Sequence, residues 1–507
     1  MLSNEWKHFK SGTDIRGVAI PDVDGPVDLT DEAVERMAFG FLCWLCKKSG
    51  KQPQELTISV GRDSRLSGPR MRDAVVKALT NGGATVLDCG LASTPAMFMT
   101  TVDLACDGAI QLTASHHPFQ RNGLKFFIPS GGVESTDIEA ILHYAQDNQF
   151  SASSEKGSCR PVSYMTDYAA RLRKLICDGL HTSEASQPLK GFHIVVDAGN
   201  GVGGFYATDV LQKLGADITG SQFLEPDGRF PNHIPNPENE DAMASICAAT
   251  VAAQADLGVI FDTDVDRAGC VDSRGKEINR NRLVALASAI ALESCPGGTI
   301  VTDSITSSGL KTFIEQELGG VHRRFKRGYK NVINESIRLN IAGVPSPLAI
   351  ETSGHAALQE NYFLDDGAYL ITKIIIKMAQ LRREGKSLDS LIERLQEPTE
   401  SVELRFHITD SDFKTKGEQI IDDLEHYARQ QGWSVADDSC EGIRLSFGKE
   451  NGNGWLLLRL SVHDPVMPLN IESDQAGGCR LIAANLSAFM RDVDGLDTTV
   501  LTDYLKG

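Results

Sequence analysis

The sequence has little that would carry a chain into or across a membrane. It begins Met1-Leu2-Ser3-Asn4-Glu5-Trp6-Lys7, which lacks the apolar core of a secretory signal peptide. The longest apolar stretches, residues 41–46 and 283–292, are too short to span a bilayer. We therefore expect a cytoplasmic protein with no membrane partner.

Basic charge is also scarce. Fifty Lys and Arg residues stand against 68 Asp and Glu residues, which gives a net charge of −18. Binding to a nucleic-acid backbone needs a basic stripe, so this balance argues against a nucleic-acid partner. An anionic small substrate is still compatible, because a few Arg and Lys side chains can line a positive pocket inside an acidic protein.

The eleven cysteines show no repeating spacing. Cys43 and Cys46 form a CxxC pair within an apolar, helical-looking run, and no second pair accompanies them. This favours packing over a zinc or redox site. We expect reduced thiols, as is usual for cytoplasmic proteins.

With 507 residues, the chain is too long for one hydrophobic core. Short β-branched runs alternate with helical stretches, which predicts three α/β domains, and the pattern changes near residue 397 to one typical of an antiparallel sheet with helices on one side. The expected domains are 1–155, 156–273, 274–396 and 397–507, with a serine-rich linker over 151–163. The expected strands are 56–60, 85–89, 109–113, 193–197, 257–262, 299–303, 348–351, 402–408, 446–447 and 455–462, and the expected helices are 71–81, 164–177 and 280–293.

Ser115 lies in the loop Thr-Ala-Ser-His-His-Pro, directly after the strand expected over 109–113. Taken alone, a serine there is more often a helix or turn cap. Asn122-Gly123 is a tight-turn signal, and residues 124–128 should form a strand that runs back beside the serine. Such a hairpin can bring the Lys125 ammonium near Ser115 as a phosphate partner or a proton-transfer group.

Asp262, Asp264 and Asp266 follow the apolar run 257–261. On an extended backbone their carboxylates would spread over roughly 13 Å, so binding one hard cation requires the chain to curl around it. A solvated acidic loop is the alternative. The oxygen-only donors favour Mg²⁺ over zinc and leave coordination positions open for a phosphate oxygen. The glycine and glutamate of an EF-hand loop are missing.

Glu351, Ser353 and His355 follow the strand expected over 348–351. A carboxylate and a hydroxyl two residues apart point the same way on an extended segment and could bridge neighbouring sugar hydroxyls. His355 could titrate near neutral pH. A helix N-cap with an incidental histidine explains this segment equally well.

Basic side chains at other turns are suited to phosphate, since arginine can bind it through two parallel hydrogen bonds. None of them is decisive alone, because most arginines are surface residues. They are Arg16, Arg62, Arg65, Lys326, Arg327, Lys330 and Arg459.

The glycines of residues 199–204 match the GxGxxG dinucleotide fingerprint, with Asp217 further on. A tight strand-to-helix turn accounts for the same glycines. An oxidoreductase with a nicotinamide dinucleotide cofactor, the other interpretation, would leave the aspartate loop unexplained.

Together these loops resemble the α-D-phosphohexomutase superfamily, especially its phosphomannomutase/phosphoglucomutase branch. The similarity runs in order along nearly the whole chain, through residues 13–17, 61–69, 113–118, 122–125, 197–204, 262–267 and 351–355. The resemblance implies four domains around a central cleft, three of them similar α/β mixed-sheet domains and the last a C-terminal α+β domain.

The resemblance also implies an activity, the interconversion of hexose 1-phosphate and hexose 6-phosphate, with glucose or mannose as the sugar. A phosphorylated Ser115 and a hexose 1,6-bisphosphate would be the intermediates, and the bisphosphate would also serve as activator. One Mg²⁺ ion would be held by Ser115, Asp262, Asp264 and Asp266. The implied catalytic residues are Ser115, Lys125, Arg16, His116 and Arg267, and the implied substrate-binding residues are Glu351, Ser353, His355, Lys326, Arg327, Arg459 and Ser461.

The alternatives are a phosphoglucosamine mutase, a phosphohydrolase or a non-catalytic sugar-phosphate binding protein. Some positions depart from the family pattern. His117 stands where Asn is usual, and Arg121 where an aromatic residue is common. The last loop reads Arg-Leu-Ser-Val-His-Asp-Pro from Arg459, in place of Arg-Pro-Ser-Gly-Thr-Glu-Pro, and Val462 makes a glycine-like backbone harder to adopt. These departures concern the preferred sugar and its phosphate. The sequence does not define the oligomeric state.

Overall fold

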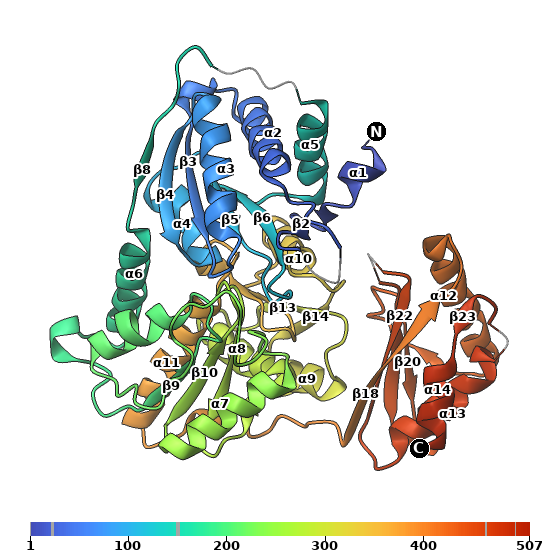
Figure 1. The fold of residues 1–507 in the computed structure, drawn as a ribbon. Helices are drawn as coiled ribbons and strands as arrows, with labels where there is room; N and C mark the ends of the chain where they lie inside the picture. The colour runs from blue at the N-terminus through green and yellow to red at the C-terminus, as the bar shows by residue number, and fades with distance from the viewer. Residues whose placement is uncertain (1, 22–24, 149–152, 462–463, 492) are drawn as a thin grey trace. The chain divides into compact units, whose positions relative to one another are not determined.

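The computed structural model describes residues 2–21, 25–148, 153–461, 464–491 and 493–507 (Figure 1). Two compact units make up the chain. Unit 1 comprises Met1–Leu283 and Ser353–Ser390, and unit 2 comprises Val284–Thr352 and Leu391–Gly507. Within the described ranges, every helix is too short or too polar to cross a membrane.

The first sheet of unit 1 has the order β1-β2-β6-β5-β3-β4-β8, and β7 pairs with β6. Strands β3, β4 and β5 are parallel, whereas β6 is antiparallel to both β5 and β2. The strands are β1 (Lys10–Ser11), β2 (Asp14–Val18), β3 (Thr57–Arg62), β4 (Thr85–Leu91), β5 (Gly108–Leu112), β6 (Arg121–Ile128), β7 (Gly131–Gly132) and β8 (Cys159–Pro161).

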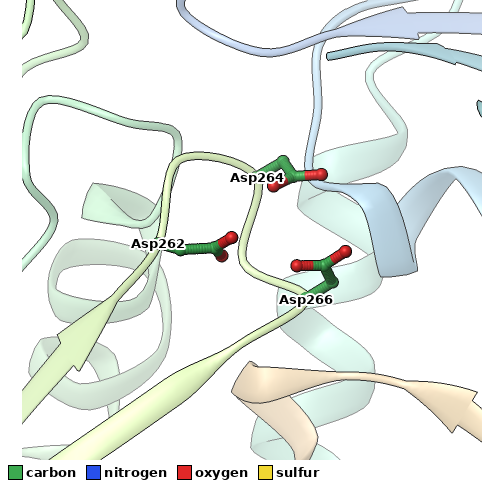
Figure 2. Close-up of side chains that lie close together, drawn as sticks. All are labelled: Asp262, Asp264 and Asp266. Atoms are coloured by element: carbon green, nitrogen blue, oxygen red, sulfur yellow. The ribbon is translucent and has the colours of Figure 1, made fainter. Parts of the chain in front are cut away.

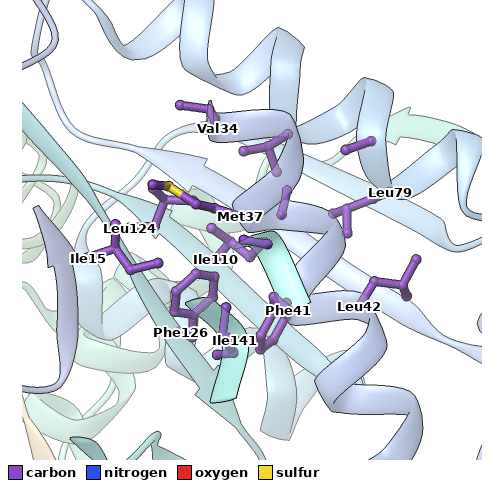
Figure 3. Packing of buried hydrophobic residues seen from close by; sticks show 14 of the residues in the cluster. Ile15, Val34, Met37, Phe41, Leu42, Leu79, Ile110, Leu124, Phe126 and Ile141 are labelled. Atoms are coloured by element: carbon purple, nitrogen blue, oxygen red, sulfur yellow. The ribbon is translucent and has the colours of Figure 1, made fainter. Parts of the chain in front are cut away.

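Helices pack on this sheet around an apolar core. Figure 3 shows Phe41, Met37 and Ile141 from the helices packed against Ile110 and Phe126 from the sheet. The helices of this part are α1 (Asn4–Lys7), α2 (Asp31–Ser49), α3 (Gly68–Asn81), α4 (Thr94–Asp103) and α5 (Ser135–Asp147).

The second sheet of unit 1 has the order β12-β11-β10-β9, in which β9 and β10 are parallel and the other pairs antiparallel. Helix α11 packs against β11 and α6, so residues from the far end of unit 1 support this sheet. The elements of this sheet and its helices are α6 (Tyr164–Gly179), β9 (Ile194–Asp197), α7 (Glu240–Ala253), β10 (Leu257–Phe261), β11 (Ala268–Asp272), β12 (Glu277–Ile278) and α11 (Gly367–Arg383). Strands β16 (Ala356–Leu358) and β17 (Leu364–Asp365), also of unit 1, do not belong to this sheet and pair antiparallel with each other.

Unit 2 contains a parallel set, in which β13 pairs with both β14 and β15. Its elements are β13 (Thr299–Thr302), α9 (Ser308–Thr312), β14 (Val321–Arg324), α10 (Tyr329–Ile341) and β15 (Leu348–Ile350). Helix α8 (Arg280–Ser294) comes before them in the chain, and unit 1 gives way to unit 2 within this helix, after Leu283.

The C-terminal part of unit 2 is a sheet of order β19-β20-β21-β22-β18-β23, antiparallel throughout, with helices packed on it around one core. Its elements are β18 (Glu400–Ile408), α12 (Phe413–Gln430), β19 (Ser434–Val435), β20 (Ile443–Phe447), β21 (Gly454–Leu458), β22 (Val466–Ser473), α13 (Gly478–Met490), β23 (Leu496–Asp497) and α14 (Thr499–Lys506).

The expected fold class, three α/β domains followed by an α+β domain, is confirmed, as are the main strands and helices. Three local expectations were wrong. Asn122 and Gly123 lie inside β6 and not in a turn, and the strand expected over 455–462 ends at Leu458. Residues 159–161 of the expected linker form β8, which pairs with β4. Residues 151–152, Val462 and His463 lie outside the described residues, and the domain boundaries remain predictions.

Candidate active site

The loop after β5 holds Ser115 in an uncommon backbone conformation. Ser115 has φ +47°, in the left-handed region that residues with a side chain rarely adopt. Its N–H donates to Thr113 Oγ1 at 2.9 Å, which satisfies the backbone within the turn. The serine is buried, so its hydroxyl points into a structured environment. Strain of this kind recurs at functional sites.

Arg65 determines the shape of this loop. Its fully buried guanidinium is paired with Asp63 at 3.2 Å. The remaining N–H groups donate to four backbone carbonyls of the loop, those of Ser115 (2.5 Å), His117 (2.6 Å), Pro118 (2.7 Å) and Arg121 (2.9 Å). The interpretation of Arg65 as a phosphate-ready group is therefore wrong, because its donors are engaged by the backbone.

The three aspartates lie on the turn between β10 and β11, which curls as one-ion binding requires. Figure 2 shows Asp262, Asp264 and Asp266 with their side chains gathered at this turn, and one ligand atom of each lies within 4.8 Å of the others. Val265, between two of them, has φ +67°, an outlier for a β-branched residue. All three aspartates are buried.

The buried carboxylates fit a hard cation. Asp264 Oδ1 and Asp266 Oδ1 are buried and accept no hydrogen bond, which is rare for buried polar atoms. Burial, together with the charges of Asp266 and Asp264, raises the pKa of Asp262 well above its usual value. An oxygen-only set with spare acceptor atoms is what Mg²⁺, Mn²⁺ or Ca²⁺ accepts.

Ser115 and the metal loop meet through Asp262 and Arg267. The Ser115 hydroxyl donates to Asp262 Oδ2 at 3.0 Å. Arg267 donates from Nη2 to Ser115 Oγ at 3.2 Å and from Nε to Asp262 Oδ2 at 3.2 Å. The Asn236 amide oxygen, at 3.2 Å from Arg267 Nη1, holds the other end of the guanidinium. A phosphoryl group on Ser115 Oγ would therefore adjoin an arginine and the carboxylate loop.

His116 lies at the same guanidinium. Its Nδ1 is 2.6 Å from Arg267 Nη2 and 3.4 Å from Ser115 Oγ. Burial and the positive charge of Arg267 lower the pKa of His116 to about 2. The ring is thus neutral and accepts the arginine N–H at Nδ1, which orients it beside the serine.

Lys125 approaches the aspartates from the neighbouring strand. It lies on β6 opposite Gln111 of β5. Its ammonium contacts Asp266 and is 4.0 Å from Asp264. Burial acts to raise the pKa of Asp266, but the charges of Lys125, His355 and Arg267 outweigh it and hold that pKa below its usual value.

Arg16 reaches the serine loop from β2, where it pairs with Gly123 of β6. Its guanidinium donates to the Thr113 carbonyl at 2.6 Å and to Asp14 at 2.6 Å. Gly123 is required here, because a Cβ would lie 2.1 Å from the Ile15 carbonyl oxygen. The residue that resembles a turn signal is therefore a close-packing position beneath Arg16.

Ser353 and His355 lie in unit 1, at the metal loop. His355 forms an antiparallel bridge with Arg267, and its Nε2 is 3.8 Å from Asp266 Oδ1. Ser353 Oγ is 3.0 Å from His355 Nδ1. Gly354 between them has φ +94°, and a Cβ there would lie 2.6 Å from the Ala268 carbonyl oxygen.

The other expected substrate-binding residues belong to unit 2. Glu351 Oε1 accepts the N–H of Gly328 at 2.6 Å, and Lys326 is exposed. Arg459 is buried, and its pKa is lowered by burial and by the nearby charge of Arg327. Ser461 donates its N–H to the Val466 carbonyl at 2.9 Å.

Sequence reasoning missed Thr94. Its hydroxyl donates to Asp264 Oδ2, and its N–H donates to the Asp264 carbonyl at 2.8 Å. The available signal was Ser93-Thr94-Pro95, an N-cap followed by proline, which marks the start of α4 after a strand. Nothing local to that signal indicates a partner 170 positions away.

The glycines of residues 199–204 form the turn between β9 and the helical segment η3 (Tyr206–Leu211). Gly201 packs against the metal loop, since a Cβ there would lie 2.5 Å from the Thr263 carbonyl oxygen. The glycines thus allow a close backbone approach, as the turn interpretation expects.

Comparison with known proteins gives matches over most of the chain. Three family profiles match, described as phosphoglucomutase/phosphomannomutase alpha/beta/alpha domains I, II and III, at residues 9–152, 167–275 and 279–398. A phosphomannomutase/phosphoglucomutase from Pseudomonas putida is 30% identical over 437 residues, which cover 85% of this chain and 87% of that protein. A phosphoglucomutase from Neisseria meningitidis is 28% identical over 93% of this chain and 94% of that protein.

Among solved structures, a phosphoglucomutase/phosphomannomutase family protein from Burkholderia thailandensis superposes with a TM-score of 0.77 at 26% identity. The superposition covers 97% of this chain and 99% of that one. The likeness therefore includes the C-terminal part that the three family profiles leave unmatched.

Proposed function

This chain belongs to the phosphoglucomutase/phosphomannomutase family of α-D-phosphohexomutases and is an isomerase of that family, and we propose that it moves phosphate between C1 and C6 of a hexose through a phosphorylated Ser115. One observation carries the assignment of Ser115. Its hydroxyl contacts both Asp262 and Arg267, which places a single nucleophilic oxygen between a carboxylate loop and a guanidinium.

The proposed metal is one Mg²⁺ ion, held by Asp262, Asp264, Asp266 and an oxygen of the phosphorylated serine. Two buried carboxylate oxygens without hydrogen bonds support this ligand set. When bound, the ion would neutralise charge on the transferring phosphoryl group, which is the main requirement of phosphoryl transfer.

We assign the chain's own groups as follows. The bond between phosphorus and Ser115 Oγ breaks as a bond to the free sugar hydroxyl forms, giving a hexose 1,6-bisphosphate. The attacking hydroxyl loses a proton and Ser115 Oγ gains one. His116 and Arg267 lie next to Ser115 Oγ. Lys125, which contacts Asp266, and Arg16, which holds the Thr113 carbonyl, are the other proposed catalytic groups. The bisphosphate then turns over, and its other phosphate returns to Ser115. Added bisphosphate would accordingly act as an activator by phosphorylating the resting serine.

The proposed substrate-binding residues are Glu351, Ser353, His355, Lys326 and Arg327, with Arg459 and Ser461 at the non-reacting phosphate. Their residue types support this, since they offer carboxylate, hydroxyl and guanidinium groups suited to a hexose phosphate. Glucose and mannose phosphates are the proposed substrates. The eleven cysteines, all described and all free thiols, support a cytoplasmic location.

Phosphorus NMR of the purified protein tests the proposal. The sample contains Mg²⁺ and a trace of hexose 1,6-bisphosphate, and glucose, mannose and glucosamine 1-phosphates are offered separately. We expect a 1-phosphate signal to convert to a 6-phosphate signal, and Ser115→Ala to abolish the conversion. Release of inorganic phosphate would instead indicate a hydrolase, and binding without turnover a sugar-phosphate binding protein. Either outcome would overturn the mutase proposal.

A further inference from the structure

Two carboxylates of unit 2 hold consecutive backbone amides of one turn. Glu441 Oε2 accepts the N–H of Arg327 at 3.1 Å, and Glu351 Oε1 accepts the N–H of Gly328 at 2.6 Å. Gly328 has φ +115°, which a side chain would disfavour, and α10 begins directly after it. Charge-assisted hydrogen bonds that the backbone donates to two carboxylates therefore fix the turn at residues 326–328.

Glu441 comes from the C-terminal sheet region but is anchored on the loop after β13. The same Oε2 atom accepts the Ser304 hydroxyl at 2.7 Å. Three residues on, Arg444 donates to the carbonyls of Ser304 (3.1 Å) and Thr306 (3.2 Å). The segment from Glu441 to Arg444 is thus attached to the loop after β13 by the side chains at both of its ends.

The backbone beside Glu441 packs directly on the strand that precedes the last loop. Gly442 has φ +60°, and a Cβ there would lie 2.1 Å from the Leu458 carbonyl oxygen and 2.7 Å from Arg459 Cα. Only glycine permits this approach. Glu441 is therefore held next to Arg459 as well as against Arg327.

Glu441 also lies among the charges that act on Arg459. Burial lowers the pKa of Arg459, the positive charge of Arg327 lowers it further, and Glu441 and Glu403 act in the opposite direction. Two guanidinium groups near each other repel, and Glu441 offsets that repulsion while its hydrogen bonds hold the turn.

We propose that Glu441 is a positioning residue that keeps Arg327 and Arg459 together as one two-arginine grip on the non-reacting phosphate of the substrate. This role rests on the proposed function. The hydrogen bonds accepted by Glu441 position the turn, whereas its negative charge weakens attraction for the phosphate dianion. Removing the charge alone, and removing the charge together with the acceptor, therefore have opposite effects on phosphate binding.

Steady-state kinetics with glucose 1-phosphate separate the two effects. Glu441→Ala removes the acceptor together with the charge, and the lost hydrogen bonds outweigh the lost charge. We therefore expect KM to rise about tenfold with kcat within about twofold of wild type. Glu441→Gln keeps an acceptor oxygen and removes the charge, so KM should equal or fall below the wild-type value. Glu450→Ala, at an exposed glutamate of the same sheet region, is the matched control and should change neither constant.

An unchanged KM in Glu441→Ala, or an equal rise in both Glu441 variants, would overturn the proposal. Should the alanine variant fail to fold, Ser304→Ala removes only the Ser304 hydrogen bond to Glu441 and should raise KM about threefold. Calorimetric titration with glucose 6-phosphate gives an independent test. We expect the glutamine variant to bind at least as tightly as wild type and the alanine variant to bind most weakly. This order is expected even if turnover is not detected. Failure of the mutase proposal and failure of the Glu441 role are therefore distinguishable.

Discussion

Ser115 Oγ donates a 3.0 Å hydrogen bond to Asp262 Oδ2, although 147 positions separate the two residues in the chain. The serine loop follows β5 of the first sheet, and the aspartate loop follows β10 of the second. In both sheets the polar loop lies at the carboxyl end of a strand in a parallel pair, where ligands of α/β proteins usually bind. The contact therefore unites the proposed nucleophile with the proposed metal ligands.

Replacing one aspartate should remove the metal site. Asp264→Asn exchanges a carboxylate, whose Oδ1 accepts no hydrogen bond, for a neutral amide. We expect Mg²⁺ affinity measured by calorimetry to fall at least about 100-fold, because a hard dication depends on anionic oxygen ligands. Asp178→Asn, at an exposed aspartate of α6, is the control. Unchanged Mg²⁺ binding in Asp264→Asn would contradict the assigned ligand set.

Thr94→Val tests the group that orients the same carboxylate. The substitution removes the hydroxyl that donates to Asp264 and nearly preserves the side-chain volume. Loss of an outer hydrogen bond of this kind typically weakens metal affinity about 10- to 100-fold. Thr101→Val, at a buried threonine of the same helix whose hydroxyl bonds the Phe98 carbonyl, is the matched control. Equal Mg²⁺ affinities for the two variants would argue against a positioning role for Thr94.

Lys125→Met should impair chemistry more than metal binding. The ammonium contacts Asp266 and lies among the groups proposed for proton transfer. Loss of a proton-transfer group lowers kcat by about 10²- to 10⁴-fold. Mg²⁺ titration of the variant should still show one site. A kcat within about threefold of wild type would exclude Lys125 from the chemical step.

Arg65→Ala should destabilise the protein, because it leaves Asp63 buried without its partner and four loop carbonyls without their donor. Breaking a buried ion pair from one side costs about 3–5 kcal/mol. The unfolding midpoint measured by circular dichroism should fall clearly. Arg62→Ala, at a half-buried arginine that ends β3, should lower it much less. A wild-type midpoint in Arg65→Ala would refute this account of the loop.

Asp366 should make stability depend on pH. This buried N-cap of α11 accepts the Tyr168 hydroxyl at 2.6 Å, and burial raises its pKa to about 6 despite that hydrogen bond. The folded pKa exceeds the unfolded value of about 3.9, so the folded state binds the proton more tightly. Its contribution to the free energy of unfolding therefore increases as pH falls from 7 to 4, by up to about 3 kcal/mol.

Asp366→Asn removes this titration. The unfolding midpoint of the variant minus that of wild type should become more negative as pH falls from 7 to 4.5. A difference that is constant over this range would mean that Asp366 titrates at its ordinary pKa in the folded protein.

Local sequence accounts for the elements and for the aspartate loop. Apolar periodicity predicted β5, β10 and α3 nearly to their ends, because burial on one or both faces of an element leaves a regular pattern. The i, i+2, i+4 spacing of Asp262, Asp264 and Asp266 after a strand likewise predicted a curled carboxylate loop, since these ligands lie within five residues. The order of such motifs along the chain was enough to identify the superfamily.

Only the tertiary structure decided which residues meet across the chain. Gly123 looked like a turn residue, yet it is a strand glycine pressed against Ile15, and Arg65 looked like a phosphate ligand, yet it binds the loop that carries Ser115. Thr94 and Glu441 left no recognisable pattern, because each acts on a partner more than a hundred positions away. Periodicity records which face of an element is buried, whereas these roles depend on the packing of distant segments.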